Sequence, residues 1–114
     1  MPSVDLIHTR HATPVIQYGR DALRDALSAR GLASHEIAYP TQSKARHVIL
    51  TGLFDDTLVR RAIGAQEHKP ESLVILRGTL EEHPVCVLAG NDPNGLLYAL
   101  LEMSDRIRHE GLAA

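Results

Sequence analysis

The sequence contains seven histidines, a residue type that can bind a metal ion or transfer a proton. His8 and His11 lie three residues apart, but their spacing crosses the expected end of a strand and no second pair follows. A zinc site of the helical type needs the motif His-Glu-x-x-His, which the sequence lacks. The other histidines lie singly near the ends of expected elements: His35, His47, His68, His83 and His109. The sequence therefore predicts no metal site and no cofactor.

The tripeptide Arg10-His11-Ala12, which follows an apolar pair, resembles the Arg-His-Gly/Ala motif of histidine phosphatases. In those enzymes the histidine accepts a phosphoryl group while arginines hold the phosphate oxygens. The second histidine that the reaction needs is not recognisable, because Glu81-Glu82-His83 falls in an expected hairpin turn. We favour a polar loop here, and we keep a small phosphatase-like enzyme using His11 as an alternative function.

Two pairs of adjacent carboxylates are present, Asp55-Asp56 and Glu81-Glu82. Hydrolysis of a glycosidic bond needs two carboxyl groups that face each other across the sugar. The first pair lies where an expected helix needs an N-terminal cap, and the second lies in a turn. Neither pair suits that chemistry, so the sequence predicts no catalytic residue in this chain.

The composition excludes several other classes of function. Cys86 is the single cysteine and lies in an apolar run, so we expect a small buried side chain and no internal disulfide. The net charge is −2 and tryptophan is absent, which argues against a nucleic-acid partner. No apolar run is long enough to cross a membrane. The first residues lack the pattern of a signal peptide, which predicts a cytoplasmic location unless such a segment was removed.

Hydrophobic periodicity and turn residues divide the chain into alternating strands and helices. Strands are expected at 4–9, 34–39, 47–52, 72–77 and 84–89. Helices are expected at 19–30, from Asp55 or Asp56 to 65, and from Pro93 to just before Gly111. Loops are expected at 10–18 and 41–46, and a hairpin turn at 78–83. This order predicts an α/β (α+β) fold, with a mixed sheet of about five strands and three helices.

The last helix has the clearest start in the sequence. Asp92 is expected to cap it, and Pro93 suits the first helical position, where its missing N–H costs nothing. Gly90 and Gly95 are expected to let the backbone pack closely at this turn. The loop from 90 to 95 matches no phosphate-binding motif, although a weak anion or sugar-hydroxyl site at the helix start stays open.

The same stretch carries a family resemblance. A strand ending in Ala-Gly is followed by Asp-Pro-x-Gly-Leu-x-Tyr-Ala-Leu-x-Glu at 92–102 and by a basic helix end. Together with Pro-Glu-Ser-Leu-Val-Ile at 70–75, this pattern resembles the N-terminal domain of alpha-glucuronidases. It is also similar to the domain that precedes the catalytic barrel in beta-hexosaminidases. The resemblance extends from about 46 to 108 and is vaguer in the first forty residues.

That resemblance implies a zincin-like α/β fold without the metal site, formed by residues 1–114 as one domain of a longer glycoside hydrolase. Catalysis would belong to a TIM barrel that follows, and this non-catalytic accessory domain would pack against it. Tyr98 and Met103, which lie off the centre of the last helix's apolar stripe, are the expected contacts. Self-association into a homo-oligomer is a further expectation. A stand-alone interaction or carbohydrate-binding module is the other alternative function.

Overall fold

The computed structural model describes residues 3–39, 43, 45 and 47–112. These residues form five strands and three helices in the order β1 (Ser3–His8), α1 (Pro14–Ala29), β2 (Ala33–Glu36), β3 (His47–Leu53), α2 (Thr57–Ile63), β4 (Leu73–Leu80), β5 (His83–Gly90) and α3 (Pro93–Glu110). Within the described part of the chain, every helix is too short or too polar to span a bilayer.

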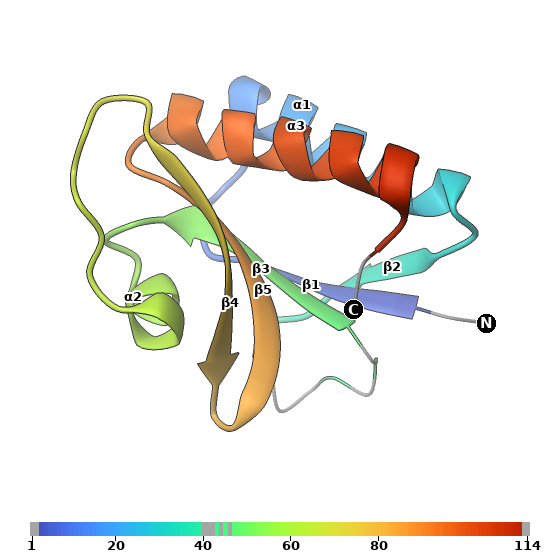
Figure 1. Ribbon diagram of the computed structural model, residues 1–114, viewed down its shortest axis with the longest axis horizontal. Helices are drawn as coiled ribbons and strands as arrows, with labels where there is room; N and C mark the ends of the chain where they lie inside the picture. Colours follow the sequence, from blue (N-terminus) through green and yellow to red (C-terminus); the bar gives the residue numbers. More distant parts are fainter. Residues whose placement is uncertain (1–2, 40–42, 44, 46, 113–114) are drawn as a thin grey trace.

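The strands form one mixed sheet in the order β2-β1-β3-β5-β4. β2, β1, β3 and β5 run parallel, and β4 pairs with β5 in the antiparallel direction. The predicted α/β fold and the antiparallel hairpin are therefore confirmed. β4 forms one edge of the sheet (Figure 1).

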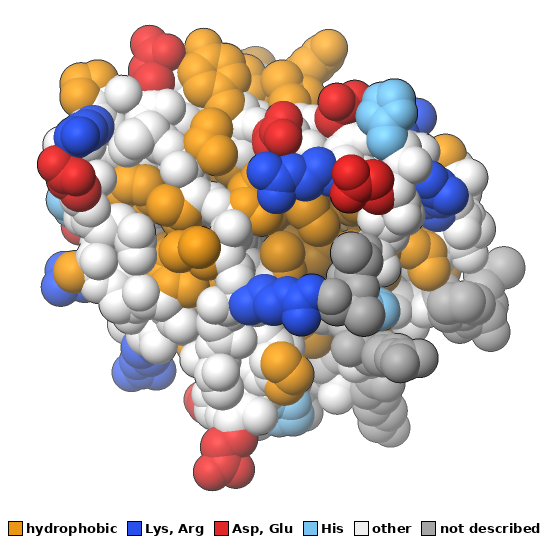
Figure 2. All heavy atoms as spheres, viewed as in Figure 1, with side chains coloured by type: hydrophobic (Ala, Val, Ile, Leu, Met, Phe, Trp, Pro, Cys, Tyr) orange, Lys and Arg blue, Asp and Glu red, His pale blue; other side chains and the backbone are white. Residues whose placement is uncertain are grey.

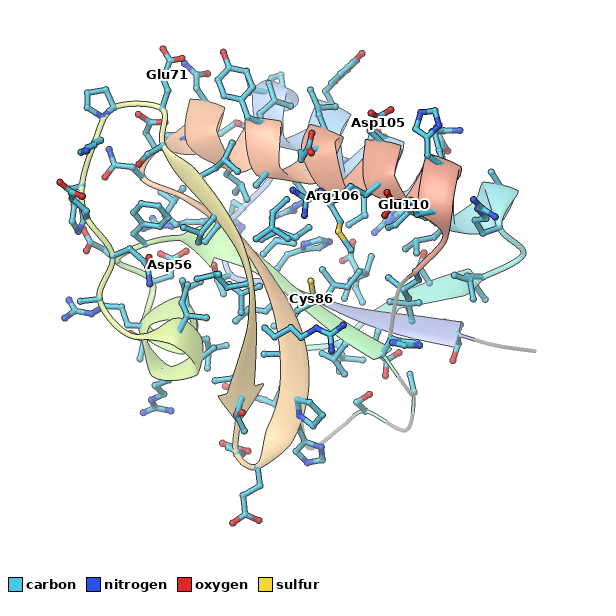
Figure 3. All side chains as sticks on the ribbon, viewed as in Figure 1. Asp56, Glu71, Cys86, Asp105, Arg106 and Glu110 are labelled. Atoms are coloured by element: carbon cyan, nitrogen blue, oxygen red, sulfur yellow. The ribbon has the colours of Figure 1, made fainter. Side chains whose placement is uncertain are left out.

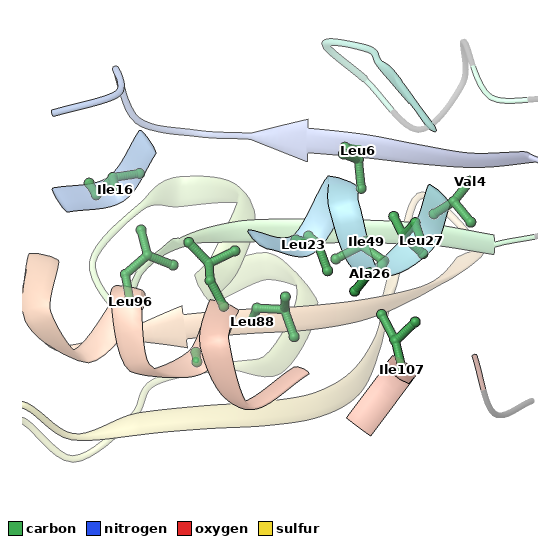
Figure 4. Packing of buried hydrophobic residues seen from close by; sticks show 12 residues of the cluster. Val4, Leu6, Ile16, Leu23, Ala26, Leu27, Ile49, Leu88, Leu96 and Ile107 are labelled. Carbon is green, nitrogen blue, oxygen red and sulfur yellow. The ribbon is translucent and has the colours of Figure 1, made fainter. Parts of the chain in front are cut away.

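Helices cover both faces of the sheet, but unequally. α1 and α3 lie side by side on one face, while the short α2 lies on the other (Figure 1). The larger core joins the apolar stripes of α1 and α3 to the sheet, where Leu6, Ile49 and Leu88 come from three neighbouring strands (Figure 4). The smaller core joins Val59 of α2 to the opposite face. This face-by-face burial explains why the central strands are apolar at consecutive positions.

α1 begins earlier than expected. The sequence predicted a loop at 10–18 and a helix from residue 19, but the helix starts at Pro14. Thr13 is its N-cap, and the Thr13 side chain accepts a hydrogen bond from the Ile16 amide. The prediction was wrong because proline was taken as a helix breaker, whereas at the first helical position it costs no hydrogen bond.

The hairpin turn is also tighter than the predicted 78–83. β4 continues to Leu80 and β5 begins at His83, so Glu81 and Glu82 alone form the turn. Both turn residues have positive φ, as a two-residue hairpin turn with the right twist requires. Two other elements are shorter than predicted, since β2 ends at 36 and α2 at 63. Most of the predicted loop at 41–46 lies outside the described residues.

Candidate functional site

The carboxyl ends of the parallel strands are the first place to look for a site. β1 leads into α1 on one face of the sheet, whereas the neighbouring β3 leads into α2 on the other face. Open α/β sheets commonly bind ligands where two adjacent strands diverge in this way. In this chain Thr9, Arg10 and Asp56 lie at that position, and we call these three residues the polar crevice.

The crevice is filled by its own side chains. One Asp56 oxygen accepts hydrogen bonds from the Thr9 hydroxyl at 2.5 Å and the Leu53 amide at 2.8 Å. The other lies 2.7 Å from an Arg10 guanidinium nitrogen, and the Asp56 side chain is only 9% exposed. Gly52 permits this approach, because a Cβ there would come within 2.1 Å of the Thr9 hydroxyl. Asp56 occupies the N-cap position of α2 but makes no side-chain capping bond, contrary to the role predicted for it.

Two buried basic side chains lie beside the crevice: His8 at the end of β1 and Arg20 of α1. The His8 side chain is 5% exposed, and its Nδ1 lies 2.6 Å from the Thr51 hydroxyl. Burial, with the charges of Arg20 and Arg24, lowers the pKa of His8 from 6.5 to about 3. His8 is therefore neutral at pH 7, so its 3.8 Å approach to Glu36 is not an ion pair. His8 Nε2 and Arg20 Nε have no hydrogen-bond partner among the described residues.

The residues singled out from the sequence for chemistry are not brought together. His11 is exposed and follows the carboxyl end of β1, whereas His83 begins β5 and so lies at the opposite end of the sheet. Arg10, which a phosphatase would need for phosphate, is held by Asp56. The hairpin-turn carboxylates are likewise at the far end from Asp56. Across the described ranges, no group of three or more His, Cys, Asp or Glu side chains is placed to hold a metal ion.

The start of α3 is a structural junction. Asp92 accepts hydrogen bonds from the Glu71 amide at 2.9 Å and the Gly95 amide at 2.8 Å. These two bonds hold the pKa of Asp92 below its usual value. A Cβ at Gly95 would come within 2.3 Å of the Ser72 carbonyl oxygen, so α3 touches the beginning of β4 here. Together with Pro93 at the first position, these contacts fix where the helix starts and which strand it meets.

A groove opens where α3 leaves β4. From the contact at Gly95, α3 crosses the sheet while β4 runs in a different direction (Figure 1). The resulting cavity has a volume of about 470 Å³. Its lining includes Ile75, Arg77, Cys86, Met103 and Arg106, together with the start of β3 at 47–49, and we call it the α3–β4 groove.

The groove has an apolar floor and charged walls. Figure 2 shows hydrophobic side chains in a hollow with basic side chains on both sides. Arg77 pairs in register with Cys86, so both side chains lie on the face that carries α3. Arg106 and Glu110 lie on the helix side of the groove, and Cys86 lies on its sheet side (Figure 3). Burial raises the pKa of the Cys86 thiol, and the two nearby arginines oppose this shift.

The two predicted contact residues lie on different sides of α3. Met103 is half-buried in the α3–β4 groove, whereas Tyr98 is 43% exposed on the outer surface of the helix and does not line the groove. Sequence reasoning did not identify Arg77 and Arg106. The sequence did contain a signal for them. Ile75 and Arg77 are two residues apart on a strand and Met103 and Arg106 are three apart on a helix, so each arginine shares a face with an apolar residue.

Comparisons with known proteins give a likeness in fold. No protein-family model and no curated protein matches the sequence. A solved structure of a GH138 enzyme targeting pectin rhamnogalacturonan II matches with a TM-score of 0.68 and 22% sequence identity. The match covers 97% of this chain and 14% of the enzyme's chain. Almost the whole of this chain is therefore similar in fold to a small part of a much larger protein.

Proposed function

We propose that this chain is a non-catalytic accessory domain of a glycoside hydrolase, and that it packs against a catalytic domain of the same polypeptide. The observation that carries the proposal is the match of 97% of this chain to only 14% of a GH138 enzyme. A fold that forms a small part of a larger enzyme is suited to supporting the rest of that enzyme. The catalytic domain is then the partner, and no cofactor is required here.

The arrangement of carboxylates supports a role without catalysis. Asp56 is bound by Thr9, Arg10 and the Leu53 amide, so neither of its oxygens is available to a sugar. Glu81 and Glu82 lie at the opposite end of the sheet, in the hairpin turn. Glycosidic hydrolysis needs two carboxyl groups within one sugar-sized site, which these residues cannot form.

The finer proposal, an alpha-glucuronidase-like or hexosaminidase-like parent with a TIM barrel, rests on the sequence pattern at 46–108. The structural likeness to a GH138 enzyme does not favour either family. The proposal that the fold is zincin-like rests on the same sequence pattern, and the structural likeness gives it no further support.

Activity assays test the absence of catalysis. The chain is expected to give no turnover of aryl glucuronides or aryl N-acetylhexosaminides. Turnover that disappears in Asp56→Asn or Glu82→Gln would show that the domain is itself an enzyme.

Deletion tests the accessory role. Removing this chain from the longer polypeptide is expected to lower the melting temperature of the remaining catalytic domain, because a covered apolar surface becomes exposed to water. An unchanged melting temperature, or a gene that encodes no catalytic domain, would contradict the proposal.

A further inference from the structure

We propose that the peptide unit Asn94-Gly95 is a site of spontaneous deamidation, and that the Asp92 side chain keeps it unreactive while the start of α3 is closed. Asparagine is one of the thermally labile residues, and a glycine after it offers a backbone nitrogen that no side chain shields. Asn94 is exposed, so water reaches its side-chain amide. The reaction does not depend on the proposed accessory role.

The reaction needs only the chain itself and water. The Gly95 nitrogen loses its proton and attacks the side-chain carbonyl carbon of Asn94, and the former side-chain nitrogen leaves as ammonia. The product is a cyclic imide, a succinimide. Water then opens the imide at either of its carbonyl carbons. One opening gives aspartate at position 94, and the other gives isoaspartate, in which the backbone runs through the former side-chain carbon.

The Asp92 cap opposes the first step of this reaction. The Gly95 N–H donates a hydrogen bond to Asp92 Oδ1 at 2.8 Å, so the attacking nitrogen is held with its proton bonded. The Glu71 amide donates to the other Asp92 oxygen at 2.9 Å, and these two bonds lower the pKa of Asp92. Asp92 is therefore ionised at neutral pH, and an ionised carboxylate is a strong acceptor. A backbone amide held in this way reacts only when the structure opens locally.

Packing opposes the closure of the imide ring. To form the ring, the backbone at Asn94 must rotate out of the helical range, so that the Gly95 nitrogen comes against the side-chain carbon. Gly95 is buried, and a Cβ on it would come within 2.3 Å of the Ser72 carbonyl oxygen and 3.2 Å of Gly90 Cα. The backbone therefore has little room to rotate while α3 touches the beginning of β4. Glu71, just before this contact, lies beside the start of α3 (Figure 3).

The two products have different effects on the fold. Aspartate at position 94 leaves the backbone unchanged and adds a negative charge in the first turn of α3, where the helix dipole favours it. Isoaspartate lengthens the backbone by a carbon atom, and so displaces Gly95 from a contact that is too tight even for a methyl group. Formation of isoaspartate therefore breaks the contact between α3 and the beginning of β4, and the closed start of the helix cannot form again.

The first test compares deamidation in the folded and the unfolded 114-residue chain. Both samples are incubated at the same mildly alkaline pH, one in buffer and one in urea, and mass spectrometry with fragmentation distinguishes Asn94 from Asn91. We expect Asn94 to react faster in urea by about tenfold or more, because the cap and the contact with Ser72 are lost. Equal rates in the two samples would overturn the protection. An Asn94 that stays intact in urea would overturn the site itself.

Substitution of Asp92 tests the cap directly. Asp92→Ala is expected to speed deamidation of Asn94 in the folded chain by about fivefold, which is the effect of losing a typical N-cap. Asp92→Ser is the matched control, because serine also accepts a hydrogen bond at this position, and its rate is expected to stay within about twofold of the wild-type rate. Equal rates in the two variants would show that the cap does not control the reaction.

A measurement on the wild-type chain covers the case in which Asp92→Ala fails to fold. Hydrogen exchange of the Gly95 amide is expected to be slow, and to rise together with deamidation as urea is added below the unfolding transition. A Gly95 amide that exchanges freely while Asn94 stays intact would overturn the role of the hydrogen bond.

Melting temperatures test the consequence of the reaction. Asn94→Asp reproduces the aspartate product and is expected to melt no lower than the wild type, because its backbone is unchanged. The aged chain that contains isoaspartate is expected to melt at a lower temperature. Equal melting temperatures for the aged and the fresh chain would contradict the loss of the contact between α3 and β4.

Discussion

The polar crevice and the α3–β4 groove differ in how deeply the carboxylate that pairs with an arginine is buried. In the crevice, Arg10 and Asp56 are bound to each other and to neighbouring backbone and hydroxyl groups. In the groove, Arg106 pairs at 3.1 Å with Glu102, whose side chain is 49% exposed, beside a half-buried apolar floor. The first carboxylate is shielded from water, while the second remains in contact with it.

The difference shows that a position where open α/β sheets commonly bind ligands can be filled by the protein's own side chains. The switch between two diverging strands is the usual ligand position in an open α/β sheet. Here that position is closed by an internal ion pair. The following predictions test this contrast, from the largest expected effect on stability to the smallest.

Asp56→Ala is expected to lower the free energy of unfolding by about 2–4 kcal/mol, because it leaves a backbone amide and a guanidinium without their carboxylate. The loss is smaller than for a fully buried ion pair because the Arg10 side chain is 47% exposed to water. Urea denaturation measures the change. Asp55→Ala is the control, since Asp55 is 66% exposed and pairs with the exposed His68 at 3.3 Å. Equal effects of the two substitutions would show that the crevice is not a structural ion pair.

Acid is expected to weaken the crevice side of the molecule through His8. The pKa of His8 is about 3 in the folded chain and 6.5 in its unperturbed state, so the unfolded chain binds the proton first. Stability contributed by neutral His8 is therefore present above pH 6.5 and is lost as the pH falls toward 3. Between pH 7 and pH 5 the free energy of unfolding is expected to fall by about 2 kcal/mol through His8.

Urea denaturation at several pH values between 5 and 7 measures this loss. His8→Gln serves as the comparison, because glutamine can still hydrogen-bond Thr51 and does not titrate. The variant is expected to show a flatter dependence on pH. Identical slopes for the two proteins would contradict the assignment to His8.

Arg106→Glu is expected to change the free energy of unfolding of the isolated chain by less than about 0.5 kcal/mol, because the side chain is exposed and its ion pair with Glu102 is exposed as well. Thermal and urea denaturation check this expectation. A small effect on stability would sharpen the contrast between this exposed ion pair and the buried carboxylate of the crevice. A loss comparable to that of Asp56→Ala would make Arg106 structural.

The sequence alone determined the order and type of the elements. Apolar periodicity located all five strands and three helices, and local backbone chemistry located the start of α3 at Asp92 and Pro93. These features were predictable because they depend on residues within a few positions of one another. Reasoning from local residues also led to two errors. Pro14 was assigned to a loop although it begins a helix, and the hairpin turn was predicted to be longer than the two residues Glu81 and Glu82.

Only the tertiary structure decided which chemical groups meet. Arg10 and Asp56 form an ion pair although they lie far apart in the sequence, because the strands that precede them are neighbours in the sheet. Arg77 and Arg106 face one groove because α3 touches β4 at Gly95 and then diverges from it. Strand order and the angle between a helix and an edge strand arise from packing over long sequence separations. No local pattern encodes them, and they determine here which charged groups meet.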